Sequence, residues 1–279
     1  MQEIFKIAVV QMRSSEDKYE NLKLSIDLVK ESAKRKASLI CFPEFQMAFS
    51  PTHQSSDDLS KLAEPIKKGN FISVLSRTAK QEKIDIVATI YEKSNIHNNK
   101  NRVYDTTVFI NRKGRISLVY RKLHLYDALG YRESDNLLPG RTIEKPAKTL
   151  IGNIGIMMCY DVRFPEMSRI LAVNGADILI APSAWVHGIM KEEHWQIMLK
   201  ARAIENGSYI IAPNQVGNVY SGRTMVVDPF GIVLLDMGNR EGMEIVEIDK
   251  SRVKNIREIL PLLKNRRIDV YRDNIRVFS

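Results

Sequence analysis

Three side chains that could share one nucleophilic reaction each stand where an apolar, strand-like run ends: Glu44, Lys122 and Cys159. Cys159 closes the run 154–158 and opens a polar turn that leads into a helical segment. A thiol held there by the scaffold can still face a pocket, and its reactivity depends on nearby charge and exposure. A carboxylate, an ammonium and a thiol in such settings predict a nucleophilic active site.

Alternating strand-like and helical segments would position these groups. In the first half, apolar runs typical of strands cover residues 7–12, 39–42, 84–91, 103–110 and 116–120. Helical spacing is expected over 18–36 and again up to about residue 81. The fully apolar runs fit strands covered on both faces. The order therefore predicts an α/β fold in which two sheets pack together with helices outside.

The second half of the chain repeats this order as a pattern. Residues 6–12, a helix and residues 38–45 resemble residues 153–161, a helix and residues 177–185. If the halves pack face to face, Glu44 leaves its strand on the same side as the thiol of the second half. Ligands of open α/β sheets bind at that edge, so the repeat predicts one site between the halves.

Three motifs carry a resemblance to a known family: FPEF at 42–45, YRKLHLYD at 120–127 and CYDVRFPE at 159–166. Their order and spacing resemble the signature segments of the nitrilase superfamily of carbon–nitrogen hydrolases. Further similar stretches are KIAVVQM, LLPG, APSAW, ARAIEN and MVVDPFG, so the likeness covers nearly the whole chain. It implies a four-layer α-β-β-α sandwich of the nitrilase type. We expect a single domain over 1–279 with a C-terminal extension from about residue 251, helical to about 267.

The resemblance implies a division of labour among the three groups. Cys159 would attack an amide carbonyl, and Glu44 would move the protons of acylation and of thioester hydrolysis. Lys122 would stabilise the oxyanion together with a backbone N–H such as that of Tyr160. Adjacent carboxylates should keep this lysine charged. Taken singly, each residue could instead be a helix-start acid, a surface lysine or an inert buried thiol.

A second glutamate is expected between the lysine and the cysteine. Glu133 is the best match, and it would hold Lys122 and the substrate or assist proton transfer. Asp135 is the alternative. A solvated loop acid is the simpler interpretation of Glu133.

Candidate substrate-binding residues follow the nucleophile or the strand near residue 180. They are Tyr160, Arg163 and Trp185. A substrate carboxylate would suit Arg163, although an ion pair with Asp161 or Glu166 would explain this residue equally well.

No metal or cofactor is expected. The histidines, at 53, 97, 124, 187 and 194, lack the spacing of zinc ligands. His124 could form a protease-like pair with the cysteine, but a supporting structural role is the preferred interpretation of each histidine.

Composition narrows the class of protein. Two cysteines among 279 residues make a poor disulfide framework and fit a reducing cytoplasm, with Cys41 as a buried core thiol. Neither a signal peptide nor a membrane span is expected. The net charge of +9 could suggest nucleic acid, but the basic residues are scattered and fit solvated helix faces. The partners expected are a small-molecule amide and, from the resemblance, a second copy in a homodimer or higher homo-oligomer.

The leading hypothesis is an amidase that hydrolyses a small linear carboxamide to a carboxylate and ammonia through a cysteine thioester. The form CYDVRFPE is closest to the branch of ω-amidases and Nit-like amidases. The alternatives are an N-carbamoyl amino acid amidohydrolase and a catalytically silent, binding member of the family.

Overall fold

The computed structural model describes residues 3–49, 54–94 and 101–274. Its first six-stranded sheet contains β1 (Ile4–Gln11), β2 (Leu39–Cys41), β3 (Asp85–Glu92), β4 (Tyr104–Ile110), β5 (Ile116–Arg121) and β14 (Gly242–Asp249). The second contains β6 (Ala147–Lys148), β7 (Asn153–Ile156), β8 (Ile178–Ile180), β9 (Tyr209–Ala212), β12 (Met225–Val227) and β13 (Val233–Asp236). A small ribbon joins β10 (Val216–Gly217) and β11 (Tyr220–Ser221).

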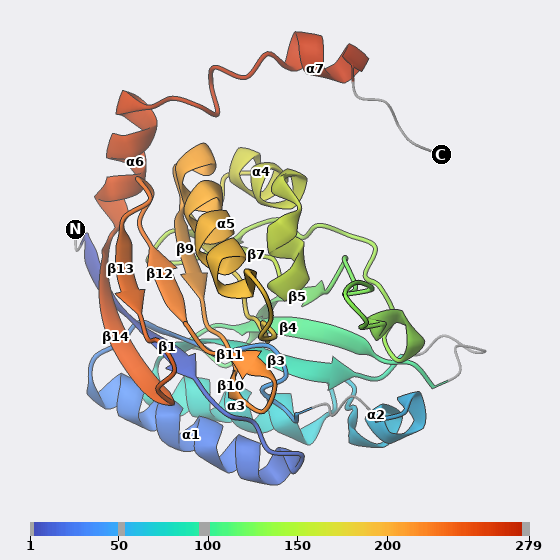
Figure 1. The fold of residues 1–279 in the computed structure, drawn as a ribbon. Coiled ribbons are helices and arrows are strands. Elements are labelled where there is room, and N and C mark those ends of the chain that lie inside the picture. Colours follow the sequence, from blue (N-terminus) through green and yellow to red (C-terminus); the bar gives the residue numbers. More distant parts are fainter. Residues whose placement is uncertain (1–2, 50–53, 95–100, 275–279) are drawn as a thin grey trace.

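Helices cover the outer faces of both sheets (Figure 1). The covering helices are α1 (Lys18–Lys34) and α3 (Asn70–Glu82) on the first sheet, and α4 (Pro165–Val173) and α5 (Lys191–Asn206) on the second. The remaining helical segments are α2 (Ser56–Leu62), α6 (Lys250–Ile259), α7 (Ile268–Asn274) and the short 3₁₀ turns η1 (Glu133–Asp135) and η2 (Cys159–Arg163). The layers run helix, sheet, sheet, helix, as expected for the sandwich.

The two sheets repeat one topology. The order β14-β1-β2-β3-β4-β5 matches β6-β7-β8-β9-β12-β13 strand for strand. In each sheet the three central strands run parallel, and the flanking strands pair antiparallel. The carboxyl ends of the central strands consequently present loops from both halves to one region of the molecule.

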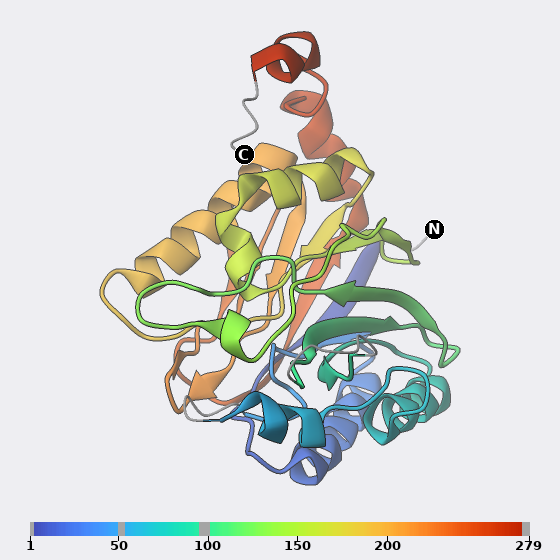
Figure 2. The same cartoon turned by 90° about the vertical axis from the view of Figure 1, so that its right-hand side faces the viewer.

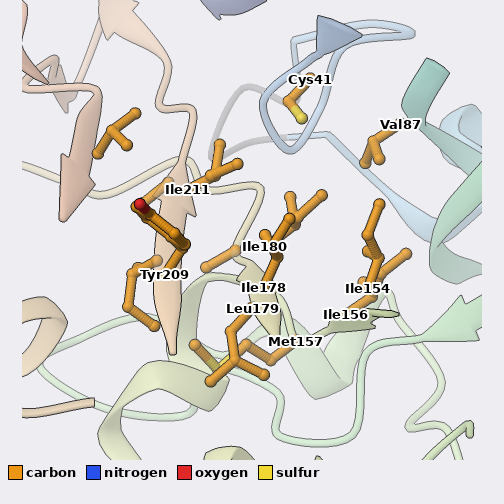
Figure 3. Close-up of a cluster of buried hydrophobic side chains, with 14 of the residues drawn as sticks. Cys41, Val87, Ile154, Ile156, Met157, Ile178, Leu179, Ile180, Tyr209 and Ile211 are labelled. Atoms are coloured by element: carbon orange, nitrogen blue, oxygen red, sulfur yellow. The ribbon is translucent and has the colours of Figure 1, made fainter. Parts of the chain in front are cut away.

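Alternation along β1 explains the apolar runs. Ile7 and Val9 belong to the core between the sheets, whereas Ala8 and Val10 belong to the core beneath α1 and α3. The inter-sheet core also holds Cys41, and Figure 3 shows this residue in one buried cluster with residues of β7, β8 and β9. Each central strand is covered on both faces, which rigidly fixes the loops at its ends.

Several predicted boundaries are wrong. The expected helix up to residue 81 is two helices, α2 and α3, because Pro65 and Gly69 lie between them and the chain there bridges to β3. The expected helix over 251–267 ends at Ile259. Pro261 follows, lacks an N–H donor and steers the preceding residue out of helical geometry. The sequence also did not reveal β14, which returns to pair with β1.

The C-terminal arm, residues 260–274, leaves the layers, and α7 stands away from them (Figure 2). Its apolar side chains Ile268, Val270 and Tyr271 are exposed. Across the described ranges, no helix combines the length and the apolar character needed to cross a membrane.

Candidate active site

The loops after three strands carry the predicted carboxylate, ammonium and thiol. Glu44 lies three residues past β2, Lys122 directly follows β5, and Cys159 opens η2 three residues past β7. The Lys122 Nζ lies 2.8 Å from Glu44 Oε1 and 2.8 Å from Glu133 Oε2. Residues far apart in the sequence thus form one buried ionic cluster.

Lys122 is fully buried within this cluster. Burial alone would lower the pKa of its ammonium, but the carboxylates of Glu133 and Glu44 outweigh burial and raise the pKa well above the ordinary value. The lysine therefore stays charged at neutral pH, as the sequence predicts. A permanent, compact positive charge is suited to stabilising an oxyanion.

Both carboxylate oxygens of Glu44 are held. Oε1 accepts from Lys122, and Oε2 accepts the Ala184 N–H at 2.7 Å. Its backbone carbonyl accepts from Gln215 Nε2 at 2.9 Å. Because Ala184 and Gln215 belong to the second half of the chain, the glutamate is fixed at the junction of the two halves.

The second acid at Lys122 is Glu133, and not Asp135. Glu133 Oε2 also accepts the Tyr126 N–H at 2.8 Å, so its carboxylate is held from two sides. Burial raises the pKa of Glu133, although Lys122 opposes this shift. Asp135 is largely exposed and lies 3.7 Å from the exposed Arg132.

Cys159 sits at a strained point of the backbone. Its φ of 43° lies in the left-handed region, which is costly for a residue with a Cβ. The thiol is nearly buried yet lines a cavity. Burial, followed by the charge of Glu44, raises its pKa well above the ordinary value. The resting group is therefore the thiol, and Glu44 is close enough to influence its ionisation.

Asp161 anchors the turn that carries Cys159. Its buried carboxylate accepts from Tyr120 Oη at 2.5 Å and from the Met158 N–H at 2.8 Å. His124 contributes its backbone N–H and its Nδ1, which lies 2.7 Å from the carboxylate. The histidine ring also stacks on Phe164. His124 therefore supports the turn through Asp161 and does not form the alternative pair with the cysteine.

A cavity of about 480 Å³ opens above the thiol, within the range of small-molecule sites. All three predicted binding residues, Tyr160, Arg163 and Trp185, line it. The Arg163 guanidinium lies 4.6 Å from the Trp185 ring centroid. Within the described part of the chain, Arg163 forms none of the ion pairs considered as the alternative explanation.

Two of the cavity residues that escaped sequence reasoning contact each other. Lys191 and Tyr126 both line the cavity, and Lys191 Nζ donates to Tyr126 Oη at 2.8 Å. Tyr126 lies inside the YRKLHLYD motif and could have been singled out there. Lys191 carried no such signal, because its place at the start of α5 looks like an ordinary helix surface.

Asp105 is a further buried acid that the sequence did not reveal. Its backbone carbonyl accepts the Lys122 N–H at 3.0 Å, so β4 places it beside the ionic cluster. Burial, followed by the nearby charge of Glu44, raises the pKa of its carboxyl well above the ordinary value. Both effects favour the protonated form of Asp105, which limits the negative charge packed around Lys122.

The other histidines lie away from this cluster or outside the described residues. His187 is exposed and 3.8 Å from Glu192, while His53 and His97 fall outside the described ranges. Among the described residues, no group of three or more histidine, cysteine, aspartate or glutamate side chains is arranged to hold a metal ion.

Comparison with known proteins identifies the class. The model of the carbon–nitrogen hydrolase family matches residues 6–258, so the chain belongs to that family. It is 35% identical to the deaminated glutathione amidase of Mus musculus, over 95% of this chain and 84% of that protein.

Two solved structures are similar along almost the whole chain. The Caenorhabditis elegans NitFhit protein has a TM-score of 0.88 and 29% identity, covering 97% of this chain and 66% of that one. Saccharomyces cerevisiae Nit3, described as a member of branch 10 of the nitrilase superfamily, has a TM-score of 0.83 and 29% identity, covering 96% and 98%.

These matches confirm the predicted family, and the sandwich is of the nitrilase type. The chain is therefore a hydrolase of carbon–nitrogen bonds in amides, as the sequence predicts. Membership of this family supports an enzyme and not the alternative of a catalytically silent binding protein.

Proposed function

We propose that Cys159, Glu44, Lys122 and Glu133 are the catalytic residues of this amidase. The observation that carries the proposal is the buried ionic cluster, in which the Lys122 ammonium lies 2.8 Å from a carboxylate oxygen of Glu44 and 2.8 Å from one of Glu133. Acyl transfer needs a nucleophile, a proton carrier and an oxyanion donor in one place. The ionic cluster would supply the proton carrier and the oxyanion donor, beside a thiol that faces the cavity.

In the proposed acylation, the Cys159 sulfur forms a bond to the amide carbon while its proton passes to Glu44. Lys122 stabilises the resulting oxyanion, together with a backbone N–H of the Tyr160 turn. When the carbon–nitrogen bond breaks, Glu44 returns the proton to the departing amine. Glu133 holds Lys122 in place throughout.

Deacylation uses the same groups. Water attacks the thioester carbon, and Glu44 accepts the proton that the water loses. The second tetrahedral intermediate then collapses to the carboxylic acid and expels the thiolate, which recovers its proton from Glu44. The acid product releases its remaining proton to solvent and leaves as the carboxylate. The raised pKa of the buried thiol favours this return to the resting state.

We propose a small linear carboxamide as substrate, with deaminated glutathione as the first compound to test, because the similar curated proteins carry that name. An N-carbamoyl amino acid is the second candidate, since the unpaired guanidinium of Arg163 beside the cavity suits its carboxylate. Tyr160 and Trp185 would form the walls against which the substrate packs.

We also propose that the chain is a single domain with an extension from about residue 251, and that it forms a homodimer in the cytoplasm. The exposed apolar side chains of α7, on an arm that leaves the layers, support a contact with a second copy. Light scattering of the full chain and of a chain ending at Ile259 would test the arm. A dimer that survives the truncation would contradict its role.

The decisive experiment is a panel of amides. Deaminated glutathione, ω-amides, N-carbamoyl amino acids and nitriles are incubated with the enzyme, and the amine or ammonia released is quantified. Mass spectrometry should detect an acyl adduct on the peptide that contains Cys159. An adduct on Cys41, or turnover of nitriles alone, would contradict the proposal.

A further inference from the structure

Three carboxyl groups lie around one ammonium in the buried ionic cluster. Glu44 and Glu133 each place an oxygen 2.8 Å from Lys122 Nζ. Asp105 is the third acid: its backbone carbonyl accepts the Lys122 N–H at 3.0 Å, and the residue is only 1% exposed. Three ionised carboxylates would bury more negative charge than one ammonium balances, which is costly. One of the three acids is therefore expected to hold a proton.

The hydrogen bonds of the three acids show which one it is. The two oxygens of Glu44 accept from Lys122 and from the Ala184 N–H, as suits an ionised carboxylate. Both oxygens of Glu133 accept from the Lys122 ammonium. Asp105 Oδ2, by contrast, is buried and receives no donor from the described residues. An ionised carboxylate in that state would cost far more than a neutral carboxyl, so Asp105 holds the proton.

The electrostatic surroundings of Asp105 agree with this assignment. Burial is the largest influence that raises its pKa, followed by the charge of Glu44, while Lys122 acts in the opposite direction. A side-chain hydrogen bond with Glu44 and the charge of Glu133 raise the pKa further. Two carboxyl groups can share a hydrogen bond only if one of them carries a proton. Asp105 is therefore the donor and Glu44 the acceptor.

The nearest ion pair on these strands lies on the other face of the sheet. Thr106 donates to Glu92, which pairs with Arg121 at 2.6 Å. Because successive side chains of a strand point to opposite faces, Asp105 points away from that pair. Tyr91, aligned with Asp105 on β3, is a further titratable group on the neighbouring strand. The carboxyl of Asp105 thus acts on the ionic cluster.

We infer that Asp105 is a positioning residue that stays protonated and donates a hydrogen bond to the carboxylate of Glu44. The inference rests on the proposed role of Glu44 as the proton carrier and deepens it. A hydrogen bond donated to a carboxylate stabilises its ionised form, so the base is ready before the substrate binds. When Glu44 takes the proton of Cys159, Asp105 keeps its own and transfers nothing.

The test compares two variants of Asp105 through the pH dependence of Cys159 alkylation by iodoacetamide, followed by peptide mass spectrometry. Asp105→Asn keeps the shape and an N–H donor, so it should retain the wild-type profile. Asp105→Leu has neither donor nor charge, so Glu44 should protonate more readily. The acidic limb of the profile should then move to higher pH by about one unit or more.

Thr107→Val is the matched control for these variants. Thr107 is buried on the same face of β4, and its Oγ1 likewise has no hydrogen-bond partner in the described part of the chain. Its profile should match that of wild type. An Asp105→Asn profile that shifts as far as that of Asp105→Leu, or a wild-type profile in the folded Asp105→Leu protein, would overturn the inference.

Infrared spectroscopy separates this inference from the proposed catalysis, and it needs only the isosteric variant. At pH 7 the difference spectrum between wild type and Asp105→Asn should contain the carbonyl band of a protonated carboxyl group. If that band is present but Glu44→Gln hydrolyses amides at the wild-type rate, the catalytic proposal fails and the protonated Asp105 stands. Carboxylate bands in place of the acid band would overturn the inference, whatever the activity.

Discussion

The two cysteines lie at the ends of different strands in the two halves, and their environments differ. Cys41 ends β2, and its side chain is fully buried between the sheets (Figure 3). Cys159 lies three residues past β7, where a left-handed backbone turns it toward the cavity. The first thiol remains part of the strand, whereas the second has left it. Position past the strand end, and not the residue type, creates the candidate nucleophile.

Their electrostatic surroundings differ as well. Burial alone raises the pKa of Cys41, whereas the ionisation of Cys159 also responds to Glu44 and Lys122. A buried thiol without a base is inert, while one beside a carboxylate can transfer its proton when substrate arrives. The first half thus supplies charge to the nucleophile of the second.

Exchanging each thiol for alanine should give the largest contrast. Cys159→Ala should lower amide hydrolysis by on the order of 10⁴-fold or more, because no nucleophile remains. Cys41→Ala should lose on the order of 1 kcal/mol of stability and keep its turnover. Amine release and thermal unfolding measure the two effects. An inactive but well-folded Cys41→Ala protein would reverse the assignment.

Glu44→Gln tests whether Glu44, in the first half of the chain, transfers the protons of the reaction. The glutamine amide has one oxygen, so it can accept from Lys122 or from the Ala184 N–H but not from both. It also cannot carry a proton, so acylation and deacylation should both slow by roughly 10²–10⁴-fold. Rapid-quench kinetics with mass spectrometry would resolve the two steps. Wild-type rates in both would remove Glu44 from this role, and Glu133 would become the candidate.

Lys122→Arg asks whether charge alone is sufficient. A planar guanidinium is wider than an ammonium and would be confined between Glu44 and Glu133 in a fully buried space. The oxyanion donor should be misplaced, at a cost of about 2.7–4 kcal/mol in kcat/KM. Lys200→Arg on the surface is the matched control. Activity near wild type in the Lys122 variant would mean that position matters less than charge.

The smallest expected effect is on stability, and it concerns the first residues of two matched strands, β3 and β9. Asp85 begins β3 and pairs with Arg112, whereas Tyr209 begins β9 and bonds through its hydroxyl to the backbone of Asp249. Burial raises the pKa of Tyr209 from about 10 to about 12. The raised pKa means that the neutral Tyr209 hydroxyl contributes fully to the free energy of unfolding below pH 10. This contribution is lost as pH rises toward 12.

Denaturant unfolding between pH 8 and 11.5 measures this contribution. The stability difference between wild type and Tyr209→Phe should shrink by about 2 kcal/mol across the upper part of that interval. A difference that stays constant with pH would show that the hydroxyl does not titrate differently on unfolding.

The sequence by itself determined the central architecture and three members of the site. Apolar runs report burial on both faces of a strand, and the residue that ends each run is marked by its polarity. Glu44, Lys122 and Cys159 were therefore visible at strand ends, and the repeated pattern predicted that the halves would meet there. The motifs around them carried the family.

Only the tertiary structure decided which distant groups touch. Ala184 binds Glu44 across 140 residues of chain, and β14 pairs with β1 at the far end of the sequence. Loop conformation also decides that Glu133, and not Asp135, contacts Lys122, and that Lys191 lines the cavity. The periodicity of the local sequence does not predict how these loops fold. Local patterns report whether a side chain is buried, whereas its partners are set by the packing of segments remote in sequence.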